Sequence, residues 1–140
     1  GFSLANGFRE SGLDTVIAQG FAGIAGAPVV VLILMIATVV VFLTEVTSNT
    51  ATATVFMPIM ISLGVTLGES PLMLMATAAL AASMAFMLPV ATPPNAVVFG
   101  SGYVTIPQMS RIGLWLNLLG IIAIMVLTYL WLPVAFALAG

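Results

Sequence analysis

The sequence predicts an all-α, polytopic membrane protein with a re-entrant helical hairpin and an unwound (broken) transmembrane helix. Of its 140 residues, 62% are hydrophobic and 4% are charged, and the mean hydropathy is +1.31. Too few polar side chains remain to cover a soluble domain of this size, so the composition favours a helical membrane protein. Polar stretches at residues 44–54 and 91–95 interrupt apolar segments, and these two stretches predict the hairpin tip and the break.

Composition also argues against several functional classes. The chain has no cysteine and no histidine, which removes disulfides, thiol chemistry and most transition-metal sites. Without these side chains we do not expect an enzyme. A net charge of −2 provides no basic patch, so we expect no nucleic-acid partner.

The chain divides into four predicted parts. Residues 1–27 are expected to be the end of a preceding helix followed by an interfacial helix, and residues 28–63 a helical hairpin with its tip near residues 44–50. Residues 71–103 are expected to form a helix broken at 89–95, and residues 108–139 the final transmembrane helix. The apolar run at 29–43 would be roughly 22 Å long as a helix, shorter than the ~30 Å hydrocarbon core. The polar tip is therefore expected inside or very near the membrane.

Three prolines in six residues predict the break. A proline has no backbone N–H, so the carbonyl four residues earlier loses its helical partner, and the residue before a proline avoids helical torsion angles. An unpaired backbone group in an apolar medium costs about 2–7 kcal/mol, so other partners must satisfy the freed groups. The prolines are Pro89, Pro93 and Pro94, and the carbonyls expected to be free are those of Ala85, Pro89 and Val90.

The chemistry of two such breaks predicts a binding site. Carbonyl and hydroxyl oxygens are hard ligands that suit alkali or alkaline-earth cations. The amide ends of half-helices carry partial positive charge and suit a carboxylate or a similar anion. Broken helices that present both kinds of terminus near the middle of a membrane are typical of secondary transporters.

Other polar residues have simpler interpretations. We expect the hydroxyls of Thr38, Thr77 and Thr128 to bond back to a carbonyl one helical turn earlier. Glu45 has three alternatives: a buried functional carboxylate, a side chain that faces water at the tip, or one that pairs with a part of the protein outside this chain.

At its two polar stretches the sequence resembles the divalent anion:sodium symporter family, the sodium-coupled dicarboxylate and citrate carriers. The matching strings are TEVTSNTATA at residues 44–53 and MLPVATPPNAVVFGSG at residues 87–102. The second string is long and specific. The resemblance covers nearly the whole chain, as the C-terminal inverted repeat only.

The resemblance implies a site. It implies that the substrate would be bound by Ser48, Asn49, Thr50, Thr92 and Pro93. A sodium ion would be held by oxygens of Thr44, Thr47, Ser48, Asn49 and Ala91. Some relatives have a smaller residue at Thr47, a change that a backbone ligand would survive.

The resemblance also implies sodium-coupled symport of succinate-like or citrate-like anions by elevator-like movement. The expected setting is the cell (inner) membrane, with lipid around a multi-pass protein that is a homodimer when full length. The chain has one Ser-Asn-Thr tip and one Pro-Pro-Asn, so it is expected to need a missing N-terminal repeat of the same transporter and not to transport alone. The alternatives are a sulfate symporter, another ion transporter of the wider superfamily (arsenite or sodium/proton), or a non-transporting helical membrane subunit.

Overall fold

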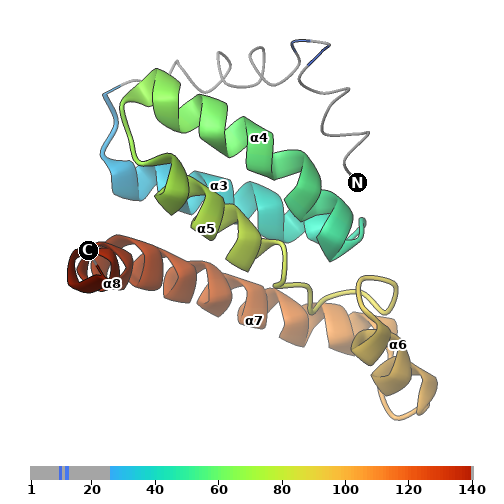
Figure 1. The fold of residues 1–140 in the computed structure, drawn as a ribbon. Coiled ribbons are helices and arrows are strands. Elements are labelled where there is room, and N and C mark those ends of the chain that lie inside the picture. The colour runs from blue at the N-terminus through green and yellow to red at the C-terminus, as the bar shows by residue number, and fades with distance from the viewer. Residues whose placement is uncertain (1–9, 11, 13–25, 140) are drawn as a thin grey trace.

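The computed structural model describes residues 10, 12 and 26–139, and every regular element in that part is helical (Figure 1). The elements are α3 (Val29–Thr44), α4 (Asn49–Leu67), α5 (Pro71–Ala81), α6 (Pro93–Gly100), α7 (Ile106–Val126), the π-helical turn η1 (Leu127–Trp131) and α8 (Leu132–Ala139). The all-α prediction is confirmed for these residues. The helices expected within residues 1–27 lie almost wholly outside the described residues.

The turn between α3 and α4 is the predicted tip. Helix α3 ends at Thr44 and α4 begins at Asn49. Ser48 starts α4 because its backbone is extended (φ −79°, ψ 142°) and its hydroxyl accepts a hydrogen bond from the Ala51 N–H. Helix α4 continues beyond the expected end at residue 63, until Gly68 takes a left-handed conformation (φ 71°). The re-entrant path of this hairpin through a bilayer stays a prediction.

The non-helical segment between α5 and α6 lies earlier in the chain than expected. It covers residues 82–92, whereas the prolines predicted a break at 89–95. Pro93 and Pro94 begin α6 instead of interrupting a helix, because the first helical positions have no intrahelical use for an N–H group. Thr92 caps this helix by accepting a hydrogen bond from the Asn95 N–H at 3.4 Å.

The last helical run extends from Ile106 to Ala139 through the π-helical turn. It begins two residues before the predicted position, because the Gln108 side chain accepts a hydrogen bond from the Thr105 N–H at 2.9 Å. By length and composition, the segments Asn49–Leu67 and Ile106–Ala135 could each cross a membrane. The second of them overlaps residues 108–139, where the final span was expected, and its passage through a membrane stays a prediction.

Helix α5 is central to the packing. It contacts α3, α4 and α7, and Figure 1 shows it between the α3–α4 pair and α7. Most of the buried apolar residues come from these four helices and the first residue after α5. Those that form the main core cluster are Leu32, Ile36, Ala37, Val40, Val41, Ile59, Met60, Leu63, Leu74, Ala78, Ala81, Ala82, Ile121 and Ile124.

The back-bonding threonines are as predicted. Thr38 donates to the Leu34 carbonyl at 2.7 Å and Thr77 to the Met73 carbonyl at 2.9 Å. Thr128 donates to the carbonyl of residue 124 at 2.7 Å. Each of these hydroxyls donates its hydrogen bond within its own helical run, so these threonines are not candidates for the binding site.

Helices α4 and α5 meet closely at Gly64. A Cβ atom at this position would lie 2.8 Å from the Pro71 Cα atom, which is backbone and cannot rotate away. Gly64→Ala is therefore expected to lower the free energy of unfolding by about 1–3 kcal/mol, the usual cost of overpacking. The thermal unfolding midpoint in detergent measures this effect. Gly100→Ala is the control, because its Cβ would meet nothing within 4 Å; equal midpoints for the two variants would contradict the prediction.

Candidate functional site

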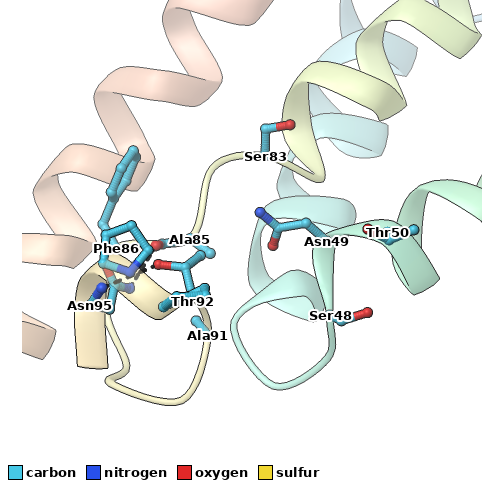
Figure 2. A pocket seen from close by; sticks show the side chains of 11 residues that line it. Ser48, Asn49, Thr50, Ser83, Ala85, Phe86, Ala91, Thr92 and Asn95 are labelled. Carbon is cyan, nitrogen blue, oxygen red and sulfur yellow. Dashed lines mark hydrogen bonds between the residues drawn. The ribbon is translucent and has the colours of Figure 1, made fainter. Parts of the chain in front are cut away.

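The two polar stretches line one pocket of about 550 Å³ (Figure 2). The tip contributes one wall, and the 82–92 segment with the start of α6 contributes the other. Its lining residues are Ser48, Asn49, Thr50, Ser83, Ala85, Phe86, Ala91, Thr92, Pro93, Pro94 and Asn95. The structure therefore brings together all five residues predicted for substrate binding.

Two helix N-termini meet at this pocket. Ser48 precedes α4 and Thr92 precedes α6, and both residues line the cavity. The first backbone N–H groups of a helix have no intrahelical acceptor and carry partial positive charge. Figure 2 shows Asn49 reaching from the tip toward the opposite wall, while the Ser48 hydroxyl points away from that wall. Asn49 is thus the side chain of the tip that is best placed to meet a solute between the two walls.

The residues predicted for sodium binding cluster around the tip. Ser48, Asn49 and Ala91 line the pocket, and Thr47 lines a neighbouring pocket of about 770 Å³ that shares Ser48 and Ala91. Thr44 lies behind the tip and is fully buried. The structure places these residues in one region, although Thr44 does not line either pocket.

Thr44 joins the tip to the opposite segment. Its hydroxyl lies 2.8 Å from Asn49 Oδ1 and 2.9 Å from the Ala82 carbonyl oxygen. Since a hydroxyl has one hydrogen for these two acceptors, one oxygen is left for another partner. Thr47 also has partners within the tip, namely the Leu43 carbonyl at 2.9 Å and the Thr52 hydroxyl at 2.6 Å.

The Asn95 side chain donates hydrogen bonds to two backbone carbonyls of the non-helical segment. Its Nδ2 atom donates to the Ala85 carbonyl at 2.8 Å and to the Leu88 carbonyl at 3.0 Å. The Ala85 carbonyl, expected to lose its helical partner, thus finds another partner in a side chain of this chain. The asparagine that follows the two prolines holds the non-helical segment in a fixed loop, and sequence reasoning had not assigned it this role.

Glu45 is a buried carboxylate, with 3% of its surface exposed. Oε1 accepts hydrogen bonds from the backbone N–H groups of Phe86 at 2.7 Å and Met87 at 2.9 Å, and Oε2 accepts from Met87 and Leu88, both at 3.1 Å. Of the three alternatives for this residue, a water-facing side chain is wrong. Its partners also lie within this chain, not in another part of the protein.

Helix α7 supports the same segment from the other side. Asn117, which is fully buried, donates from Nδ2 to Glu45 Oε1 at 2.7 Å. Ser110 donates to the Met87 carbonyl at 3.2 Å, and a Cβ at Gly113 would lie 2.3 Å from the Phe86 carbonyl oxygen. These three residues are spaced by three and four positions, so they share one helix face.

The sequence held a signal for Asn117 that our reasoning missed. It is an amide in the middle of a long apolar span, and polar groups at membrane depth usually face a partner inside the protein. Glu45 gives the same signal. Two isolated polar side chains in apolar surroundings are candidates to pair with each other.

The fold and site together define a class of protein. Two segments of the described residues, Asn49–Leu67 and Ile106–Ala135, are long and apolar enough to cross a membrane. The N-termini of α4 and of the short helix α6 meet at one pocket, an arrangement known from helical membrane transporters.

Comparison with known proteins then gives the family. The model of the family described as "Sodium:sulfate symporter transmembrane region" matches residues 1–138. The chain belongs to this family, the divalent anion:sodium symporters, as its two polar strings indicated.

Curated relatives agree with the family. The chain is 47% identical over 133 residues to the sodium-dependent dicarboxylate transporter SdcS of Staphylococcus saprophyticus, and the match covers 95% of this chain and 26% of the relative. It is 46% identical over 134 residues to the protein of the same name in Staphylococcus aureus strain USA300, which covers 96% of this chain and 26% of that relative. The chain thus spans about a quarter of the length of the curated relatives it matches.

Proposed function

We propose that this chain is the C-terminal repeat of a sodium-coupled symporter for di- or tricarboxylates such as succinate and citrate. In this proposal it supplies half of the substrate site and one sodium site. The observation that carries the proposal is the convergence of two helix N-termini and several neutral oxygens on one pocket. The names of the relatives, which are sodium-dependent dicarboxylate transporters, support the choice of solutes.

The pocket suits an anion bound without basic side chains. None of its lining residues is charged, so an anion would be held by neutral hydrogen-bond donors and by the helix termini. Each terminus is equivalent to about half a positive charge. Asn49 and Thr50 on one side, with Thr92 and Pro93 on the other, would contact one carboxylate, and the N-terminal repeat would supply the contacts for the second.

Sodium would supply the remaining positive charge. Carbonyl and hydroxyl oxygens from Thr44, Thr47, Ser48, Asn49 and Ala91 form a ligand set of the hard, neutral kind that alkali cations prefer. The Thr44 hydroxyl has one hydrogen and can donate to only one of two oxygens, Asn49 Oδ1 and the Ala82 carbonyl oxygen. The other oxygen is then available to bind a cation. A cation beside the two N-termini would raise the affinity for the anion, which is the physical basis of coupling.

We further propose that the remaining parts lie in the longer polypeptide that contains this chain, called here the complete transporter. These parts are the N-terminal repeat and the surfaces for a homodimer in the lipid bilayer of the cell (inner) membrane. Proteoliposomes test the function: an inward sodium gradient should drive succinate uptake by the complete transporter, and choline in place of sodium should abolish it. Uptake by the 140-residue chain alone would overturn the half-site proposal.

Sulfate is the second candidate, because the family description names it. We expect succinate in the presence of sodium to raise the thermal unfolding midpoint of the complete transporter by more than sulfate does. A ligand that binds only the folded state stabilises it by about 2.7 kcal/mol at 100 times its Kd. Thermal scans with each anion, in sodium and in choline, measure the difference. A larger shift with sulfate would reverse the assignment.

A further inference from the structure

The non-helical segment 82–92 is held by side chains of this chain itself. Three successive backbone N–H groups, at Phe86, Met87 and Leu88, donate to the Glu45 carboxylate. Two carbonyls of the same segment accept from Asn95. The hydrogen bonds that a continuous helix would have made here are thus replaced by two side chains, one at the tip and one in α6.

The Glu45 contacts are strong and demanding in geometry. A carboxylate that accepts from several N–H groups makes charge-assisted hydrogen bonds, about twice as strong as neutral ones. Glu45 is the only buried ionisable side chain in the described part of the protein. It follows Thr44, whose hydroxyl lies beside Asn49 Oδ1 and the Ala82 carbonyl. The same turn therefore carries the site residues and fixes the opposite wall of the pocket.

Asn117 orients this carboxylate from α7. Its Nδ2 atom donates to Glu45 Oε1 at 2.7 Å, and its Oδ1 atom is buried with no hydrogen-bond partner among the described residues. A buried unpaired acceptor is costly, and an apolar side chain would avoid that cost. The arrangement is explained if the amide is needed for its hydrogen bond to Glu45.

We propose that Glu45 and Asn117 are positioning residues for the sodium and substrate site. Glu45 holds the amides of residues 86–88 so that the segment leading to Ala91 and Thr92 keeps its distance from the tip, and Asn117 keeps the carboxylate in place. The inference rests on the proposed function. It goes beyond the residues that would touch a solute, because neither side chain lines the pocket.

Three variants of the complete transporter test the inference. Glu45→Gln keeps the shape but turns one acceptor oxygen into a donor that faces backbone N–H groups. Glu45→Asp keeps the charge but withdraws it by one methylene. Asn117→Leu keeps the volume and removes the hydrogen bond. The matched controls are Glu69→Gln, in the α4–α5 turn, and Thr128→Val, a buried polar residue on the last helical run that bonds only to its own helix.

Two measurements are made on each variant, after normalisation to the amount of monodisperse protein. The sodium concentration for half-maximal succinate uptake is expected to rise about tenfold or more for both Glu45 variants and about threefold or more for Asn117→Leu, as loss of hydrogen bonds to a charged group implies. Hydrogen–deuterium exchange of a peptide covering residues 82–92 is expected to become faster. Both quantities should stay within about twofold of wild type in the controls.

The outcomes separate the two proposals. If the wild type shows no sodium-dependent uptake, the proposed function fails, while the exchange measurement still tests the positioning role alone. Wild-type behaviour of Glu45→Asp would show that the charge suffices without the contacts, and would overturn the positioning role. Variants with less folded protein but an unchanged sodium requirement would reduce Glu45 and Asn117 to residues of general stability, which also overturns it.

Discussion

Replacing Gly113 by alanine in the complete transporter is expected to reduce sodium-dependent succinate uptake about fivefold or more. The added Cβ would lie 2.3 Å from the Phe86 carbonyl oxygen and 2.6 Å from the Met87 Cα atom, both of them backbone. Either α7 or the 82–92 segment must move, and that segment is tied to Glu45. Overpacking of this kind costs about 1–3 kcal/mol, and about 1.4 kcal/mol corresponds to tenfold. Initial uptake rates per folded transporter measure the loss.

Gly120→Ala is the matched control on the same helix. Its Cβ would meet the Met84 Sδ atom at 3.3 Å, and a methionine side chain can rotate away at little cost. Uptake by this variant is expected to stay within about twofold of wild type. If Gly113→Ala transports as well as Gly120→Ala, the close support of the non-helical segment by α7 has no functional role.

Asn49→Ala in the complete transporter is expected to raise the half-saturating concentrations of sodium and succinate by about 5-fold to 150-fold. The change removes an amide that reaches into the pocket and the acceptor for the Thr44 hydroxyl. Leaving such groups unpaired costs about 1–3 kcal/mol, which converts to that range. Uptake measured over matrices of sodium and succinate concentrations gives both values.

Thr66→Val controls for a polar-to-apolar change in the same helix. Its hydroxyl bonds back to the Ser62 carbonyl at the far end of α4 from the tip, so the kinetic values should match wild type. Unchanged transport in Asn49→Ala would favour a helical membrane subunit that does not itself carry the solute.

Local chemistry accounts for the tip and for the start of α6. The tip near residues 44–50 was predicted from residue types a few positions apart, and the same short-range rules explain the Ser48 cap and why α6 begins at Pro93. The threonines that bond to their own helices follow from the same short-range reasoning. The meeting of the tip and the prolines at one pocket was predicted from the shared need of two breaks for partners, and the structure brings them together.

The early start of the break could not be predicted from local sequence. Residues 82–88 are rich in alanine, methionine and leucine, which are strong helix formers. The amides of residues 86–88 bond to Glu45, which lies 41 to 43 residues earlier, and not to a carbonyl of their own helix. Helical periodicity carries no information on contacts at such separations. The sequence therefore could not identify Glu45 as the acceptor for these backbone N–H groups.

The separation of Asn117 from Glu45 has a consequence during biosynthesis. The two side chains are 72 positions apart, and ribosomes add about 5–20 residues per second. At those speeds Asn117 is synthesised roughly 4–14 s after Glu45. Until then Glu45 lacks its donor from α7, so the full set of contacts that the finished molecule shows at this side chain can form only late in synthesis.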